Sequence, residues 1–206
     1  MFRIDLAVPF ADKDKARRLG ARWDAAHGVW FVPGDRDASP FASWLPNPGQ
    51  LNVRAPSYFL AATSRLCWRC SGSSRVHGFA LPAGHEVLCV DDDSGEESWE
   101  AAEEPSFICY LEYLQPSAVA RIRAHTAGYR YGLRRRTQTF YWVNFCEHCG
   151  AKLGDYDTFC EPGQGFMPLT REDAARVTLT RVNEPFTARA DGWSFGVELF
   201  EFMPER

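Results

Sequence analysis

Cys67-Trp68-Arg69-Cys70 and Cys146-Glu147-His148-Cys149 are two Cys-x-x-Cys pairs, and Gly150 directly follows the second. Two residues between cysteines let one tight turn present two thiolates, and Zn²⁺ prefers four such ligands in a tetrahedron. Gly150 tolerates positive φ, which allows backbone N–H groups to point at the sulfur atoms. The pairs therefore predict one structural zinc site, with Cys67, Cys70, Cys146 and Cys149 as ligands.

The distance between the pairs shapes the expected fold. A zinc ribbon has roughly 15 to 20 residues between its pairs, whereas Ser71 to Phe145 intervene here. A single site would therefore close a long insertion. We expect an α+β protein in which residues 58–206 form a mainly β domain of zinc-ribbon type containing that insertion.

Redox chemistry, disulfides or a mixed metal site could also account for the cysteines. A thioredoxin-like redox pair needs a helix N-terminus, and neither pair follows a strand-to-helix pattern. Structural disulfides need an oxidising compartment, yet Met1-Phe2-Arg3-Ile4-Asp5 is no signal peptide. The mixed site stays open: His77 or His85 could complete a site with one pair while the other pair is incidental.

The composition limits the kinds of partner that we expect this protein to bind. The 206 residues carry a net charge of −4, which argues against indiscriminate nucleic-acid binding, because that affinity comes from an excess of Lys and Arg. Any contact with DNA or RNA must come from a local patch. No apolar run approaches the ~20 residues of a membrane span, and no targeting segment is visible. We therefore expect a cytoplasmic protein without membrane contact.

The first 46 residues are expected to form a small module of their own. Alternation over 4–8 predicts a strand, and 11–19 predicts a helix that ends at Gly20. Residues 22–33 predict a hairpin in which Trp23 and Trp30 face each other. A second short helix is expected over 37–45. The result is a hairpin-and-helix module.

This module resembles a known family. The resemblance rests on Leu6-Ala7-Val8-Pro9-Phe10, Asp14-Lys15-Ala16, Leu19-Gly20-Ala21-Arg22-Trp23-Asp24, Trp30-Phe31-Val32-Pro33 and Trp44-Leu45. Residues 4–46 are similar to the small uncharacterised domain attached to plasmid-type DNA primases and to multidomain proteins of phages and conjugative elements. The resemblance implies association with nucleic-acid-processing proteins of mobile elements. It implies no enzymatic activity for residues of this module.

A second resemblance covers residues 65–166. The sequences Gly150-Ala151-Lys152-Leu153-Gly154-Asp155 and Glu161-Pro162-Gly163-Gln164-Gly165-Phe166 are similar to the region downstream of the cysteine pair in uncharacterised bacterial zinc-ribbon proteins. This resemblance implies a zinc-ribbon domain and brings no known activity.

The rest of the chain divides by composition. Pro and Gly predict a linker over 47–57, and residues 58–206 form the second domain. Within it we expect a strand at 58–62, a hairpin over 77–90 turning at 82–84, and a solvated acidic loop over 91–104. A strand at 107–114, a helix at 116–123, a strand at 140–145 and a closing strand at 193–203 follow.

Arginines and aromatic residues supply a candidate nucleic-acid surface, since guanidinium groups bind phosphate and stack on bases. The candidates are Arg17, Arg18, Arg22, Trp23, Trp30, Arg130, Arg134, Arg135 and Arg136. Two alternatives stay open. The tryptophans could be core rather than a stacking platform, and the arginines could dock on the acidic loop or keep a strand soluble.

No catalytic motif accompanies the cysteines, and four thiolates leave a metal no open position for water. We therefore expect no enzyme. The sequence favours a zinc-binding accessory protein of a bacterial or mobile-element system that contacts DNA or RNA. The alternative is a protein-interaction adaptor with a purely structural zinc site. A third hypothesis is an enzyme with a site around Asp155.

Overall fold

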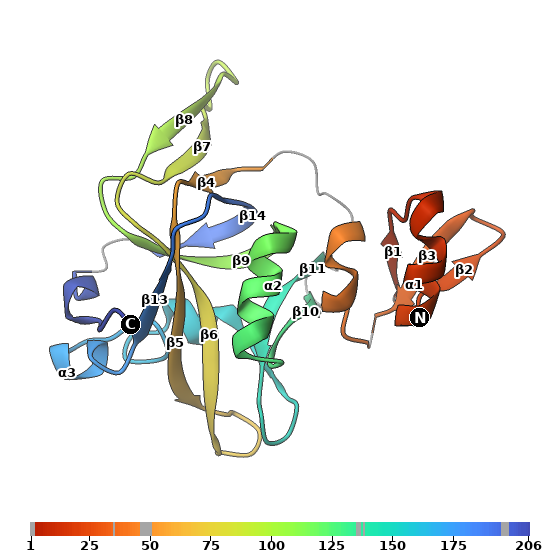
Figure 1. The fold of residues 1–206 in the computed structure, drawn as a ribbon. Helices are drawn as coiled ribbons and strands as arrows, with labels where there is room; N and C mark the ends of the chain where they lie inside the picture. The colour runs from red at the N-terminus through yellow and green to blue at the C-terminus, as the bar shows by residue number, and fades with distance from the viewer. Residues whose placement is uncertain (1–2, 35, 46–50, 135–136, 138, 195–197) are drawn as a thin grey trace.

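The computed structural model describes residues 3–34, 36–45, 51–134, 137, 139–194 and 198–206. It is mainly β with few helices, and it has a small N-terminal sheet and a large antiparallel sheet (Figure 1). The expected arrangement, a hairpin-and-helix module followed by a mainly β part with the four cysteines, is confirmed. No helix in the described ranges is long and apolar enough to cross a bilayer.

The N-terminal sheet has the strand order β1-β3-β2. Its strands are β1 (Arg3–Leu6), β2 (Arg22–Asp24) and β3 (Val29–Pro33). A short 3₁₀ turn, η1 (Phe10–Asp12), leads into α1 (Lys13–Leu19). Gly20 caps the helix at φ 99°, as predicted, because a residue without Cβ adopts this left-handed conformation at little cost. The second predicted helix is the 3₁₀ segment η2 (Ser39–Trp44).

The large sheet has eleven strands among the described residues. They are β4 (Val53–Ala55), β5 (Tyr58–Leu66), β6 (Ser73–Leu81), β7 (Glu86–Val90), β8 (Glu97–Ala101), β9 (Ser106–Leu114), β10 (Tyr129–Arg134), β11 (Thr139–Phe145), β12 (Lys152–Leu153), β13 (Thr178–Val182) and β14 (Phe186–Trp193). The order is β13-β5-β6-β9-β14-β4-β7-β8. β11 branches from β9 and pairs with β10 and β12.

Both faces of the large sheet are buried at its central strands, such as β5, β6 and β9. Along β5, Tyr58 and Leu60 point into one core, and Phe59 and Ala61 into another, as the two-residue period of a strand requires. The helix α2 (Pro116–His125) covers the first core. On the second lie the π-helical turn η3 (Tyr156–Cys160), α3 (Arg171–Ala174) and the 3₁₀ turn η4 (Phe200–Phe202). Two-sided burial explains the continuous apolar run at the start of β5.

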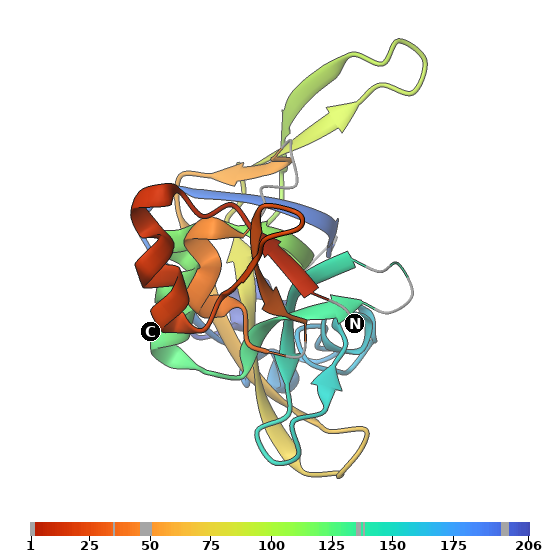
Figure 2. The ribbon, with the colours of Figure 1, turned by 90° about the vertical axis from the view of Figure 1, so that its right-hand side faces the viewer.

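The N-terminal module packs against the larger part. Phe41 and Trp44 of η2 belong to the same core cluster as Val119 and Ile122 of α2. Figure 1 shows η2 between the small sheet and α2, and Figure 2 shows the module in front of the large sheet. The two parts therefore share a continuous apolar interface.

Two predictions about residues 77–104 need correction. The segment 91–104 is exposed, as predicted, but it is a loop only in part: Glu97–Ala101 forms β8, which pairs with β7, and the hairpin projects from the body in Figures 1 and 2. The expected hairpin over 77–90 is absent from the described part, because β6 pairs with β5 and β9, while β7 pairs with β4 and β8. The turn at 82–84 thus connects strands that do not pair.

Two segment boundaries also differ from expectation. Part of the predicted linker 47–57 lies in the sheet, since Val53–Ala55 forms β4 between β14 and β7; residues 46–50 lie outside the described ranges. The predicted closing strand 193–203 is wrong over its last part. Trp193 ends β14, whereas Phe200–Phe202 is a 3₁₀ turn whose rings pack on the second core.

Candidate metal centre and basic surfaces

The two Cys-x-x-Cys pairs form loops with the same backbone hydrogen bonds. In the first, Cys67 N–H donates to Gly72 O at 2.9 Å and Ser71 N–H donates to Cys67 O at 2.9 Å. In the second, Cys146 N–H donates to Ala151 O at 2.8 Å and Gly150 N–H donates to Cys146 O at 2.9 Å. The fifth residue of each loop has positive φ, 57° at Ser71 and 68° at Gly150. The first loop therefore uses a serine where the second uses glycine.

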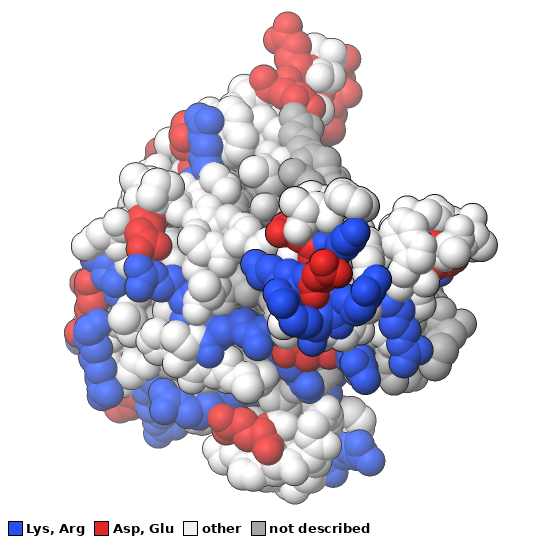
Figure 3. Space-filling view, turned by 45° about the vertical axis from the view of Figure 1, so that its right-hand side comes forward, with Lys and Arg blue, Asp and Glu red and all other residues white. Residues whose placement is uncertain are grey.

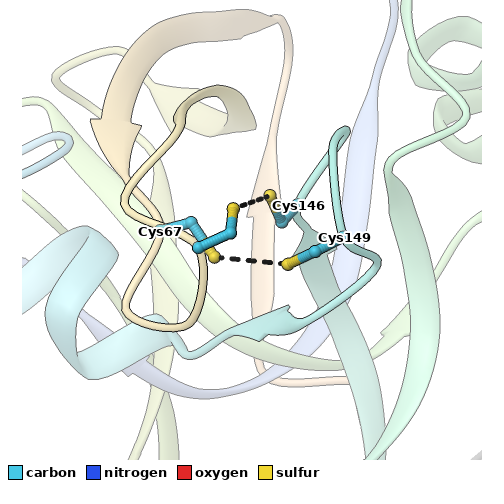
Figure 4. Close-up of side chains that lie close together, drawn as sticks. Cys67, Cys146 and Cys149 are labelled. Carbon is cyan, nitrogen blue, oxygen red and sulfur yellow. Dashed lines mark hydrogen bonds between the residues drawn. The ribbon is translucent and has the colours of Figure 1, made fainter.

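The loops bring four sulfur atoms together. They lie side by side at one end of the sheet, between β5 and β6 and between β11 and β12 (Figures 1 and 2). Cys67 Sγ lies 3.7 Å from Cys149 Sγ, and Cys70 Sγ lies 3.7 Å from Cys146 Sγ. All four ligand atoms lie within 4.8 Å of one another, and Figure 4 shows them converging from the two loops.

These distances fit a tetrahedral metal ion. A Zn–S bond of about 2.3 Å gives a tetrahedron with edges of about 3.8 Å, and the two measured sulfur–sulfur distances are 3.7 Å. A disulfide has a separation of about 2.05 Å, and all seven cysteines are free. The four cysteines therefore form a group that can hold one metal ion.

Backbone donors lower the pKa of Cys67 and Cys146, whereas burial and the neighbouring sulfur atoms raise the pKa of Cys70 to about 12. The N–H groups of Cys149 and His148 point at Cys146 Sγ, and the first of these is the main cause that lowers the pKa of Cys146 to about 6. Arg69 N–H lies 3.4 Å from Cys67 Sγ. Hydrogen bonds to the thiolate favour the deprotonated form that binds metal.

Side chains of the loops cross to the neighbouring loop. His148 Nε2 donates to Ser73 O at 2.7 Å, and Trp68 Nε1 donates to Lys152 O at 2.9 Å. Gly72 lets the loops approach, since an added Cβ would lie 2.9 Å from His148 Cδ2. The two half-sites thus hold each other in position through contacts outside the four ligands.

Neither His77 nor His85, the possible substitute ligands, belongs to the cysteine group. His85 Nδ1 donates to Pro82 O at 2.8 Å. The backbone of His77 pairs with the side chain of Asn144: His77 N–H donates to Asn144 Oδ1, and Asn144 Nδ2 donates to His77 O, each at 2.8 Å. In the described structure the four-cysteine set is complete without them.

The aromatic pair of the small module divides into a buried and an exposed ring. Trp23 and Trp30 face each other across β2 and β3, with ring centroids 5.5 Å apart. Trp30 is buried, whereas Trp23 is 51% exposed. Trp30 is therefore a core residue and the ring of Trp23 is accessible, while the stacking platform stays a prediction.

The cations nearest Trp23 in the sequence are exposed. Figure 3 shows Lys and Arg side chains gathered over the N-terminal module, with acidic atoms among them. Arg18 and Arg22 are exposed and have no ion pair among the described residues, while Arg17 lies 3.8 Å from Asp14. Asp24, the neighbouring carboxylate, is engaged by Arg3 and His27.

The arginines of β10 are already engaged. Arg130 stacks on Phe145, with Cζ 4.1 Å from the ring centroid. Arg134 stacks on Tyr110 at 4.3 Å, and its Nη1 lies 3.1 Å from Asp191 Oδ2. Arg135 and Arg136 lie outside the described residues. The structure places β10 on the large sheet, so its arginines and those of α1 belong to different parts of the molecule.

The sequence did not predict the hydrogen bonds of two buried polar residues, Asn144 and Asp155. Asn144 pins β6 to β11 beside the second loop, and its position just before a cysteine pair was the only signal. Asp155 is 1% exposed and accepts a 2.6 Å hydrogen bond from Tyr110 N–H. No short motif contains Asp155 together with Tyr110, or Asn144 together with His77.

Comparison with known proteins covers only the start of the chain. Residues 3–46 match a domain of unknown function, DUF5710. Two DNA primases named TraC from Escherichia coli are similar: one is 50% identical over 53 residues, 26% of this chain, and the other is 54% identical over 37 residues, 18% of this chain. The chain covers only 5% and 3% of these relatives' own lengths.

The resemblance of the N-terminal module to a domain of plasmid primases is thereby confirmed. The family match ends at residue 46, so the likeness of residues 65–166 to bacterial zinc-ribbon proteins stays a prediction. No solved structure matches the chain.

Proposed function

We propose that this protein is a zinc-binding accessory factor of a bacterial mobile-element system, and that the basic face of its N-terminal module contacts DNA or RNA. The observation that carries the proposal is the exposed Trp23 ring in a module that also exposes the side chains of Arg18 and Arg22. Bases stack on exposed aromatic rings, and arginines neutralise phosphates. The similarity of the module to part of a DNA primase supports a role with nucleic acid.

Zinc is the proposed metal of the four-cysteine group. Four thiolates at tetrahedral distances are a structural zinc set, and a site with four protein ligands has no open position for a catalytic water. In this proposal the ion stabilises the fold and the protein binds rather than catalyses. The exposed face of the small module, not the metal, would meet the ligand.

Charge reversal on that face gives the decisive test. We expect Arg18→Glu/Arg22→Glu to weaken binding of single-stranded DNA, measured by fluorescence anisotropy with the zinc-loaded protein at two salt concentrations. Each phosphate interaction that is lost should also reduce the log–log salt slope by about 0.7 for a single strand, so the loss of both should reduce it by about 1.4. Parallel titrations with duplex DNA and RNA identify the preferred nucleic acid.

Two matched variants sharpen the result. Trp23→Ala should weaken single-strand binding with little change in salt slope, because base stacking on an indole ring neutralises no phosphate. Arg134→Gln serves as the control, since that guanidinium already contacts Tyr110 and Asp191. Binding that is absent, indifferent to salt, or abolished only in the control variant contradicts the proposal.

A protein-interaction adaptor is the second candidate. The β7–β8 hairpin favours it, because this arm projects from the body and carries acidic side chains, as Figures 1 and 3 show. Its chemistry fits a basic protein surface. We expect this role if the zinc-loaded protein fails to bind any nucleic acid while replacement of 91–104 by a short turn abolishes capture of a genetically associated partner.

A further inference from the structure

A hollow of about 250 Å³ lies between β5, β6, β13 and the C-terminal end of α2. We call it the His77 pocket. Its polar walls come from residues distant in sequence: Arg75, His77, His125, Glu147, Thr178, Thr180 and Arg206. The remaining lining is mostly apolar and belongs to β5 and α2. None of the residues of the proposed nucleic-acid face lines this pocket, and Glu147 is its one lining residue from a cysteine loop.

His77 gives the pocket a buried polar group without a partner. The residue is 8% exposed, and its Nδ1 is fully buried with no hydrogen bond among the described residues. Its backbone N–H and C=O are both hydrogen-bonded to the side chain of Asn144, which fixes the position of this residue on β6. Burial lowers the pKa of His77 to about 4, which keeps the imidazole neutral at pH 7. A neutral imidazole can still donate one hydrogen bond.

A second imidazole has one nitrogen committed. His125 Nδ1 donates to Arg121 O at 3.0 Å, a bond that fixes the tautomer of the neutral ring. In this tautomer Nε2 carries no proton and can only accept a hydrogen bond. His125 is exposed, so the pocket has an accessible rim.

Cationic side chains outnumber anionic ones in the lining. The side chains of Arg75 and Arg206 are exposed and make no ion pair with a described residue. The single side-chain carboxylate, Glu147, is held by the backbone, since its Oε2 accepts from Arg75 N–H at 3.0 Å. Two guanidinium groups against one such carboxylate favour an anionic occupant.

We propose that the His77 pocket binds phosphate, either free or as the phosphate group of a small ester. Guanidinium forks match phosphate oxygens, and the His77 ring and the Thr180 hydroxyl group can add donors. The hollow is smaller than the roughly 300–1,000 Å³ of drug-sized ligand sites, which suits a small anion better than a polymer. The site stands apart from the face assigned to nucleic acid.

Titration of the zinc-loaded full chain with inorganic phosphate tests the proposal. We expect saturable shifts in the ¹H–¹⁵N spectrum around Val76, His77 and Thr180, at constant ionic strength against chloride. Arg75→Gln should weaken the affinity by about tenfold, because this variant removes a charge-assisted hydrogen bond. His125→Gln should weaken it less; both residues are exposed, so the fold should survive.

A nucleoside 5′-monophosphate and its nucleoside distinguish the two sources. Tighter binding of the monophosphate than of inorganic phosphate, with no binding of the nucleoside, supports an ester; equal binding supports free phosphate. Arg18→Glu/Arg22→Glu is the matched control and should leave phosphate affinity unchanged, so this site and the nucleic-acid face can fail separately. Shifts that do not saturate, or that persist in Arg75→Gln at unchanged affinity, overturn the proposal.

Discussion

Asp155 is a carboxyl group enclosed by protein. It is 1% exposed, and its Oδ1 has no hydrogen bond among the described residues. Desolvation raises the pKa of Asp155 to about 7, against which the hydrogen bond from Tyr110 N–H acts only partly. Tyr110 itself has φ 51°, a strained value for a residue with Cβ. This buried, titratable side chain therefore accepts a hydrogen bond from a strained residue of β9.

The raised pKa predicts a pH dependence of stability. An unfolded Asp loses its proton near pH 3.9, whereas the folded chain keeps it to about pH 7. Between these values the native state binds more protons, so the free energy of unfolding falls as pH rises and then levels off above about pH 7.

Asp155→Asn should flatten this curve, because the amide cannot ionise and its oxygen can still accept from Tyr110 N–H. The measurement is urea unfolding of zinc-loaded protein at pH 6 and pH 8, with zinc retention checked at both. Parallel curves for the two proteins would contradict the assignment.

The roles of some single residues could be predicted from the sequence, and the roles of others could not. The four ligands followed from spacing alone, because two residues between cysteines define a local turn. The sequence did not show that Trp30 is buried and Trp23 exposed. Both occupy equivalent positions in a hairpin, and the packing of α1 and η2 decides which ring is buried. The burial and hydrogen bond of Asp155 could not be predicted either, because its partner Tyr110 lies 45 residues away in the sequence.

At the scale of elements, the two cysteine loops act as one unit across β5–β6 and β11–β12. Cys67 and Cys146 also belong to the second core cluster, so the metal site and that core support each other. We expect Cys149→Ser to lose bound zinc, and the midpoint of thermal unfolding to fall by about 10 °C or more, since each kcal/mol is worth about 2–4 °C at this size.

Metal analysis and calorimetry check this prediction. Chelation of the unmodified protein should reproduce the shift, and hydrogen exchange should increase first at 67–72 and 146–151. Cys89→Ser is the control, because this half-buried cysteine on β7 lies outside the group. Unchanged zinc content in Cys149→Ser would show that the four sulfurs are not its ligands.

Local patterns predicted the elements that carry clear alternation or capping signals, such as α1 with Gly20 and the β2–β3 hairpin. β8 was not predicted because Glu97–Ala101 is almost entirely exposed, and acidic residues on both sides give no apolar period. The pairing of β7 with β4 rather than β6 depends on long-range topology, which a turn signal at 82–84 cannot reveal.

For the whole molecule, the shared interface between η2 and α2 predicts joint unfolding. Phe41 is 2% exposed and lies in the cluster that contains Val119 and Ile122. Phe41→Ala should cost about 3–5 kcal/mol and lower the stability of both parts in one transition. Leu169→Ala, at a 65% exposed site, is the control and should have little effect.

Coincidence of two probes tests this expectation: near-UV circular dichroism, which follows the packed aromatic rings, and far-UV circular dichroism, which follows the sheet. A separate early transition of the small module in the variant would show that the interface does not couple the parts. The boundary at residue 46 was visible in the sequence, but this docking was not, because Phe41 and Val119 belong to segments far apart along the chain.

The four-cysteine group joins the two ends of a segment that holds most of the large sheet, from β6 to β11. During synthesis the first pair leaves the ribosome well before the second, and domains generally fold as units. A nascent or truncated chain therefore carries only half a coordination sphere. Binding of a metal ion by all four cysteines would therefore require a chain in which the intervening strands are already complete.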